Sequence, residues 1–336
     1  MRAFLLAAGK GTRFRPVTER IPKPLFPFLN VPLARAHLVR LRKAGIREAG
    51  VNLHHLGGEI RRELEHGAAD LPELRFFEEP RILGTAGALR NARDFLDGSD
   101  FLVVNADAAI EPDFEKLLAA HRKSGRPATL LVVENREPDH YTPLQAEGDR
   151  IVGFGGRPEK PLLYTGICVL SPALLARIPP GETALVGDLW RPLLDAGEIG
   201  RVDHEGPFHD LGVPGDFLGA SLEALSRGAP FPAASGTFDP AGRVLSAPGA
   251  ALVGTLEDCV VGRARIGRGA ILASTVAWDG VEIGEGARLT RCLAAGGRVP
   301  PGAVHADALL WPGADGIACP HPLDPSQRLH RESPRR

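Results

Sequence analysis

Residues 3–16 read AFLLAAGKGTRFRP and contain the strongest local signal in the chain. The apolar run Ala3–Ala8 predicts a buried strand, and a glycine-rich turn follows it at once. Because Gly9 and Gly11 have no side chains, backbone N–H groups there can approach a polyphosphate closely, and the guanidinium of Arg13 can neutralise its charge. The spacing fits neither a dinucleotide fingerprint nor a Walker A loop. We therefore expect a phosphate-binding loop of another kind after the first strand.

The chain from residue 3 to about residue 230 alternates short apolar runs with amphipathic stretches. Such alternation is typical of parallel strands joined by crossover helices, and ligands then bind at the carboxyl ends of the strands. The predicted strands are Ala3–Ala8, Glu48–Leu53, Arg75–Phe77, Phe101–Asn105, Ala128–Glu134 and Leu163–Leu170. The predicted helices are Leu33–Ala44, Gly58–Glu65, Ala86–Ala92, Asp113–Ser124 and Asp216–Leu225.

The sequence pattern changes near residue 228. The stretch GAPFPAASGTFDPAG is rich in Pro, Gly and Ser and has no apolar periodicity. We place a domain boundary there, between residues 1–228 and 229–319, and expect the polar, Pro-rich residues 320–336 to be a disordered tail.

Short apolar units recur in the second domain. An aliphatic residue, then a small one, then Ala or Val recurs at Ile266, Leu272, Ile283 and Val299. The spacing of 16 or 17 residues between Ile266, Ile283 and Val299 is close to three six-residue steps per turn. The pattern resembles the hexapeptide repeats of a short left-handed parallel β-helix, and a Gly-rich irregular β domain is the alternative.

Composition excludes several classes of protein. The 336 residues carry 40 Lys and Arg against 41 Asp and Glu, a balance that argues against a bulk electrostatic nucleic-acid binder. The 4 cysteines stand far apart and form no disulfide framework or zinc motif. Neither a signal peptide nor an apolar run of the ~18 residues needed to cross a membrane is recognisable. We expect a cytoplasmic protein with no membrane or nucleic-acid partner.

Five separated motifs carry a resemblance to a known family. They are residues 6–16 with Pro22-Lys23-Pro24, LGTAGAL at 83–89, Asn105-Ala-Asp107, Tyr164-Thr-Gly-Ile167, and Asp210-Leu-Gly-Val-Pro214. Their types and order resemble the sugar-phosphate nucleotidyltransferases, also called nucleotide-sugar pyrophosphorylases, over about residues 1–225. The resemblance implies an α/β fold: a Rossmann-like domain with a mixed, mostly parallel sheet, which the left-handed parallel β-helix would follow.

The resemblance also implies an activity. Enzymes of this family join a sugar 1-phosphate to a nucleoside triphosphate, and pyrophosphate leaves. By the resemblance, Arg13 stabilises the pyrophosphate and Lys23 contacts the phosphates near the α-phosphorus. Asp107 and Asp210 match the two carboxylates that hold Mg²⁺, a cation that prefers such oxygen ligands with water in its remaining positions.

The family's nucleotide contacts fall on the loop after the first strand and on the segment around G-T-A. In this chain they correspond to Leu6, Ala8, Gly9, Gly11, Thr12, Arg13, Glu79, Gly84 and Thr85. Many uridylyl and thymidylyl enzymes of the family have glutamine where this chain has glutamate. A carboxylate can accept both N1–H and N2–H of guanine, so Glu79 favours GTP. The alternative is that this glutamate caps a loop or points to solvent.

The sugar phosphate is expected near Glu159, Lys160, Thr165 and Gly166, which match family elements at a shortened spacing. We favour mannose 1-phosphate or a related hexose or heptose 1-phosphate. Uridylyl transfer to a glucose- or N-acetylmuramic-acid-type 1-phosphate is the main alternative. A non-catalytic regulatory subunit that binds nucleotide sugars is another, and acyl transfer by the second domain, with His305, a third. We expect a homo-oligomer that assembles through the β-helix.

Overall fold

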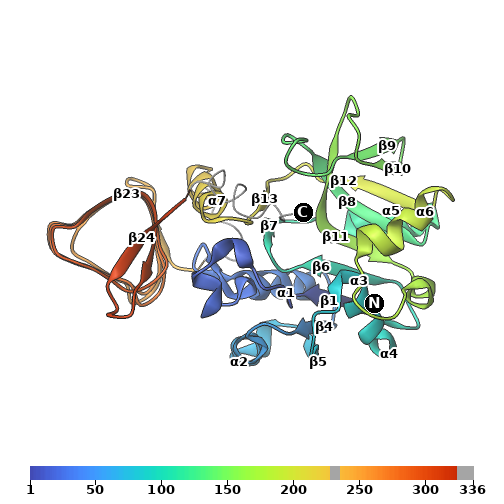
Figure 1. Ribbon diagram of the computed structural model, residues 1–336, viewed down its shortest axis with the longest axis horizontal. Coiled ribbons are helices and arrows are strands. Elements are labelled where there is room, and N and C mark those ends of the chain that lie inside the picture. Colours follow the sequence, from blue (N-terminus) through green and yellow to red (C-terminus); the bar gives the residue numbers. More distant parts are fainter. Residues whose placement is uncertain (228–234, 324–336) are drawn as a thin grey trace, which may run out of the picture. The chain divides into compact units, whose positions relative to one another are not determined.

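The computed structural model describes residues 1–227 and 235–323 (Figure 1). The predicted boundary at residues 228 and 229 and most of the predicted tail lie outside these residues. The chain divides into two compact units, which we describe separately. The first unit comprises Met1–Lys10, Pro22–Pro24 and Ala34–Phe208, and the second comprises Gly11–Ile21, Leu25–Leu33 and the described residues from His209 onward.

A nine-stranded sheet organises the first unit. Its strand order is β5-β4-β1-β6-β11-β8-β12-β10-β9. These strands are β5 (Glu73–Glu78), β4 (Glu48–Leu53), β1 (Arg2–Leu6), β6 (Phe101–Asn105), β11 (Leu162–Leu170), β8 (Ala128–Glu134), β12 (Ile199–Asp203), β10 (Arg150–Phe154) and β9 (Leu144–Glu147). A further short strand of this unit is β7 (Ala108–Ile110), whereas β13 (Phe208–Asp210) begins in the first unit and ends in the second.

The sheet is mixed, as expected, but not mostly parallel. Of its eight neighbouring pairs, β5–β4, β4–β1, β1–β6 and β8–β12 are parallel. The other four, β6–β11, β11–β8, β12–β10 and β10–β9, are antiparallel. The prediction was too strong because β11 and β10 each run opposite to both of their neighbours. The direction of a buried strand leaves no mark in its apolar pattern.

Helices and short turns connect these strands. The helices are α1 (Leu33–Lys43), α2 (Gly57–Glu65), α3 (Gly84–Asn91), α4 (Arg93–Leu96), α5 (Phe114–Ser124) and α6 (Arg191–Leu194). The 3₁₀ turns are Lys23–Leu25, Ala68–Asp70 and Pro172–Arg177, and Leu185–Trp190 forms a π-helical turn. The ends of α5 show local causes: the Asp113 carboxylate caps its first turn by accepting from Lys116 N at 2.8 Å, and Gly125 ends it with φ +64°.

In the second unit the chain winds into a coil, in which each turn adds parallel strands to two ladders. One ladder runs β14-β15-β17-β19-β21-β23-β24 and the other runs β16-β18-β20-β22. Their bounds are β14 (Thr237–Asp239), β15 (Val244–Ser246), β16 (Ala251–Leu252), β17 (Thr255–Val261), β18 (Arg265–Ile266), β19 (Ile271–Ala277), β20 (Glu282–Ile283), β21 (Arg288–Ala294), β22 (Arg298–Val299), β23 (Val304–Pro312) and β24 (Ala318–Pro322).

The residues that suggested the repeat stack in register. Ile266 pairs with Ile283 and Ile283 with Val299, and all three side chains are buried. Leu272 lies on the other ladder, where it pairs with Leu289. The stacking confirms that one turn of the coil takes 16 or 17 residues. The left-handed sense of the coil stays a prediction.

Corners with positive φ divide the long strands of the coil into two segments. Asp258, Ser274, Arg291 and Asp307 have φ between 49° and 53° and recur at the same place in successive turns. Since this left-handed conformation costs a residue with a side chain roughly 1–2 kcal/mol, the surrounding ladder must impose it. With the two-residue strands of the shorter ladder, each turn therefore presents three faces.

The remaining elements of the second unit are α7 (Pro214–Ser226), the 3₁₀ turns Thr12–Phe14 and Val17–Glu19, and the short strands β2 (Pro27–Phe28) and β3 (Val31–Pro32). At the other end of the described chain, β24 continues to Pro322 and pairs with β23. Residues 320–322 were expected to belong to a disordered tail, and that expectation was wrong because their backbone groups join the ladder.

Candidate functional site

The end of β1 is held by hydrogen bonds from two other segments. The carbonyl of Leu6 accepts a hydrogen bond from Ala106 N at 3.1 Å, and Ala7 N donates to Asn52 Oδ1 at 2.7 Å. These bonds fix the chain that leads into the predicted phosphate loop at Ala8 and Gly9. The loop thus starts at the carboxyl edge of the sheet, where β4 and β6 also end.

Lys23 and Asp107 form an ion pair at the same edge. Lys23 Nζ lies 3.0 Å from Asp107 Oδ2, and the lysine side chain is 7% exposed whereas the aspartate side chain is 43% exposed. Lys23 lies in a 3₁₀ turn and Asp107 lies two residues after β6. The structure therefore brings together two residues that sequence motifs 84 positions apart had singled out.

His37 on α1 contacts the segment that carries Asp107, and no sequence motif indicated this residue. Its side chain is buried, and Nε2 lies 2.9 Å from the carbonyl of Ala108, the residue after Asp107. Burial, with a further contribution from Arg40, lowers the pKa of His37 to about 4. The ring is therefore neutral at pH 7, and its Nε2–H donates to Ala108.

A second group that the sequence analysis missed centres on Asn52, at the carboxyl end of β4. Asn52 Nδ2 donates to Glu79 Oε1 at 2.8 Å, and Leu83 N donates to Glu79 Oε2 at 3.1 Å. Asn52 and Glu79 are each 3% exposed. Glu79, which was predicted to accept hydrogen bonds from guanine, thus accepts two hydrogen bonds from within the protein, one at each oxygen.

The G-T-A segment begins α3 and packs against backbone. Gly84 has φ +74°, and a Cβ there would lie 2.3 Å from the carbonyl oxygen of Thr183. Thr85 Oγ1 accepts a hydrogen bond from Leu185 N at 2.9 Å. Both residues, which were predicted to contact nucleotide, therefore also hold the segment at residues 183–185.

The predicted sugar-phosphate residues fall into two groups. Thr165 is buried, and its hydroxyl donates to the carbonyl of Leu131 at 2.9 Å. Gly166 has φ +84° at an irregularity in β11, and a Cβ there would lie 2.8 Å from the side chain of Asn105. The bulge thus places Gly166 against the strand that leads to Asp107. Glu159 and Lys160 are exposed.

The second unit holds the remaining predicted residues. Gly11 has φ +57° and its carbonyl accepts from Phe14 N at 2.9 Å, so the turn that contains Thr12 and Arg13 is closed locally. A Cβ at Gly212 would lie 2.7 Å from Arg13 Nη1, which places the Arg13 guanidinium against the turn that follows Asp210.

Phe14 anchors this loop in the second unit. Its ring packs against Phe26 with 4.7 Å between centroids and against Phe217 of α7 at 6.3 Å. Phe14 therefore belongs to an aromatic cluster of the second unit.

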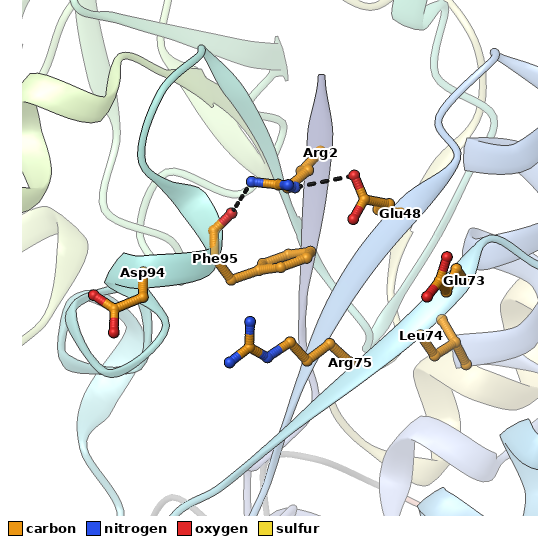
Figure 2. A pocket seen from close by; sticks show the side chains of 7 residues that line it. All are labelled: Arg2, Glu48, Glu73, Leu74, Arg75, Asp94 and Phe95. Atoms are coloured by element: carbon orange, nitrogen blue, oxygen red, sulfur yellow. Dashed lines mark hydrogen bonds and ion pairs between the residues drawn. The ribbon is translucent and has the colours of Figure 1, made fainter.

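A pocket of about 230 Å³ lies at the opposite edge of the sheet. Figure 2 shows the side chains that line it. Its lining residues come from the starts of β1, β4 and β5 and from α4: Arg2, Glu48, Glu73, Leu74, Arg75, Asp94 and Phe95. Arg2 donates to Glu48 Oε2 at 3.1 Å and to the carbonyl of Phe95 at 2.7 Å, so its guanidinium is already paired. This pocket contains none of the predicted site residues.

Three further properties bear on the chemistry. Among residues 1–227 and 235–323 no three His, Cys, Asp or Glu side chains gather as a metal cluster. All four cysteines are free. Within the same residues, no helix has the length and apolar character needed to cross a membrane.

Comparison with known proteins places these features in a family. The nucleotidyl transferase family matches residues 2–227. The chain is 32% identical over 304 residues to a mannose-1-phosphate guanylyltransferase of Mycobacterium tuberculosis, with 86% of this chain and 83% of that protein covered.

Another relative is the mannose-1-phosphate guanylyltransferase catalytic subunit beta of Danio rerio. It is 32% identical over 226 residues, which make up 65% of this chain and 63% of that protein, so the match spans less than two thirds of its length. Among solved structures, HddC from Yersinia pseudotuberculosis in complex with GMP-PN aligns with a TM-score of 0.57 at 22% identity, covering 66% of this chain and 98% of that one. That likeness supports the fold.

Proposed function

Because the chain belongs to the nucleotidyl transferase family, we propose that it transfers a guanylyl group from GTP to mannose 1-phosphate or a related sugar 1-phosphate. The observation that carries the proposal is the Lys23–Asp107 ion pair, which combines a buried cation with a half-exposed carboxylate at the carboxyl edge of the sheet. The similarity to mannose-1-phosphate guanylyltransferases favours guanine and mannose among the alternatives.

In the proposed reaction, an oxygen of the sugar 1-phosphate attacks the α-phosphorus of GTP. The bond from the α-phosphorus to the β-phosphate bridging oxygen breaks as the new P–O bond forms, and pyrophosphate leaves with the electron pair. Most of the rate comes from positioning and charge neutralisation, because the protein forms no covalent bond with the substrates.

Each proposed residue then has one role. The Lys23 ammonium neutralises phosphate charge near the α-phosphorus, since its stem is buried and its head is held in place by Asp107. The Arg13 guanidinium stabilises the departing pyrophosphate, and the backbone of Gly9 and Gly11 gives the phosphates close access to N–H groups. The backbone at Gly166 faces the sugar phosphate, together with Glu159 and Lys160.

The donor set fits magnesium. Mg²⁺ keeps several water molecules and binds through one or two carboxylates together with substrate phosphates. Asp107 offers a half-exposed carboxylate. Asp210 is the second carboxylate that the family resemblance assigns, and these two residues would hold the cation. When bound, the cation would neutralise the charge that develops on the phosphate oxygens.

The reverse reaction tests the proposal. With Mg²⁺ and pyrophosphate, the protein should convert GDP-mannose into GTP and mannose 1-phosphate, and chelation of the metal should stop it. A folded protein that binds GDP-mannose but never forms GTP would support the regulatory-subunit alternative instead.

We also propose that the chain assembles into a homo-oligomer through its coil. Val253 and Val304 are 64% and 70% exposed on the coil's surface, and a second copy would shield them from water. Sedimentation of the full chain and of Val304→Asp tests this: the variant should dissociate at a higher concentration than the wild type does.

A further inference from the structure

Four groups around Glu79 form a hydrogen-bonded chain with a fixed direction. Ala7 N donates to Asn52 Oδ1 at 2.7 Å, Asn52 Nδ2 donates to Glu79 Oε1 at 2.8 Å, and Leu83 N donates to Glu79 Oε2 at 3.1 Å. The Ala7 and Leu83 groups are backbone N–H donors, whose polarity no rotation can reverse. The orientation of the Asn52 amide follows, because its oxygen must face Ala7.

This direction decides what residue 79 can be. Two donors converge on its two terminal atoms, so both atoms must be acceptors, as they are in a carboxylate. An amide at position 79 would point its N–H₂ at either Leu83 N–H or Asn52 N–H₂. Rotation of the Asn52 amide by 180° would relieve the contact with residue 79. It would turn the Asn52 N–H₂ toward Ala7 N–H, however, so two donors would face each other there. Because Asn52 and Glu79 are 3% exposed, water is poorly placed to relieve it.

The chain of bonds also links two segments of the proposed nucleotide site. Ala7 lies between the predicted nucleotide contacts Leu6 and Ala8, and Leu83 directly precedes Gly84 at the start of α3. The backbone of Glu79 is fixed as well, because its N–H donates to Leu53 and its carbonyl accepts from His54 Nδ1 at 2.7 Å. A change in polarity at position 52 or 79 therefore reaches both segments.

We propose that Asn52 is a positioning residue for nucleotide selection: through Glu79 it fixes the spacing between the Ala7 peptide and the start of α3. This inference rests on the proposed function. Glu79 then acts through the two backbone segments that it joins, and its carboxylate does not accept hydrogen bonds from the guanine base.

The proposal is tested by exchanging the amide and the carboxylate between positions 52 and 79. Asn52→Asp alone places two carboxylates face to face, and Glu79→Gln alone creates the conflict between donors. In the double variant, the new carboxylate at position 52 accepts from Ala7 N and from the new amide at position 79, whose oxygen accepts from Leu83 N. All the hydrogen bonds return, with the net charge of the wild type. Thr129→Val is the matched control, because it breaks the buried His121–Thr129 hydrogen bond (2.9 Å) near the amino end of β8.

The readouts are the KM values for GTP and UTP, the KM for the sugar 1-phosphate, and direct binding of both nucleotides by calorimetry. Each single variant should weaken GTP binding by roughly ten- to hundredfold, as loss of a hydrogen bond to a charged group does. The KM for sugar phosphate should stay unchanged. The double variant should recover both GTP affinity and the preference for GTP over UTP, whereas Thr129→Val should lower stability without altering that preference.

Three results would overturn the proposal. One is a double variant no better than the weaker single variant, and another is an Asn52→Asp protein with unaltered selectivity. The third is a double variant that regains turnover but not the preference for GTP over UTP, which would show that Glu79 contacts the base. Failure of the proposed function is separable, because a wild-type protein without turnover would still report Asn52's role through nucleotide binding.

Discussion

Replacement of Gly84 by alanine should be among the most damaging single changes in the first unit. Gly84 has φ +74°, and a new Cβ would lie 2.3 Å from Thr183 O and 2.9 Å from Thr183 C. Both atoms are backbone, so no side-chain rotation relieves the contact. The Thr183 carbonyl cannot move freely either, since it accepts hydrogen bonds from Ala86 N at 3.0 Å and Gly87 N at 3.3 Å.

The expected loss in the free energy of unfolding is the sum of three contributions. Left-handed backbone at alanine costs roughly 1–2 kcal/mol, overpacking about 1–3 kcal/mol, and the weakened Thr183 hydrogen bonds about 1 kcal/mol. The free energy of unfolding should therefore fall by about 3–6 kcal/mol, a large share of the 5–15 kcal/mol typical of a domain.

Gly125→Ala is the matched control. Gly125 has φ +64°, and a Cβ there would meet nothing within 4 Å, so this variant should lose only the roughly 1–2 kcal/mol of backbone strain. Urea unfolding of both variants and the wild type, followed by circular dichroism, measures the difference. If the two variants lost equal stability, the close packing of Gly84 on Thr183 would not have the energetic role assigned to it.

Three further predictions follow from individual groups. The pKa of His37 is lowered from 6.5 to about 4, so neutral His37 favours the folded state above pH 6.5. About 3 kcal/mol of the free energy of unfolding should disappear as pH falls from 6.5 to about 4, and urea titrations should show a flatter pH dependence in His37→Gln; parallel profiles would contradict this. Lys23→Met should reduce turnover by roughly 10²–10³-fold while changing stability by less than about 1 kcal/mol, because water can solvate the half-exposed Asp107; kinetics with near-wild-type kcat would refute the role of Lys23. Burial raises the pKa of the Cys168 thiol to about 12 and that of the Cys259 thiol to about 11, and it also raises the pKa of Cys292. Because Cys319 is exposed, a thiol reagent should label one cysteine in the native protein and four in denaturant. Rapid labelling of a second native thiol would show that a buried strand opens.

The sequence predicted those strands that are marked by a run of apolar residues. The strands Glu48–Leu53, Phe101–Asn105 and Ala128–Glu134 match β4, β6 and β8 at both ends because each is a short, mostly apolar run. The strand β12 and the hairpin of β9 and β10 were missed, since their edges are polar or irregular. The antiparallel course of β11 was missed because strand direction depends on the whole sheet.

The site shows the same division. Motifs singled out Lys23 and Asp107, and the fold pairs them. Asn52 and His37 had no motif, because their roles depend on partners 45 and 71 positions away in the sequence. One signal was present for Asn52: a polar amide inside the apolar run VNL at the end of a strand usually has a specific hydrogen-bonding partner.

Release of pyrophosphate reports directly whether the protein transfers a nucleotidyl group to a sugar 1-phosphate. The protein would be incubated with Mg²⁺ and each pair formed from GTP, ATP, CTP, UTP or dTTP and the 1-phosphates of mannose, glucose, N-acetylglucosamine, N-acetylmuramic acid or a heptose. The proposed function predicts rapid release with GTP and mannose 1-phosphate or a related sugar, and none from Asp107→Asn. Absence of release from every pair, in a folded protein that still binds nucleotide, would contradict it.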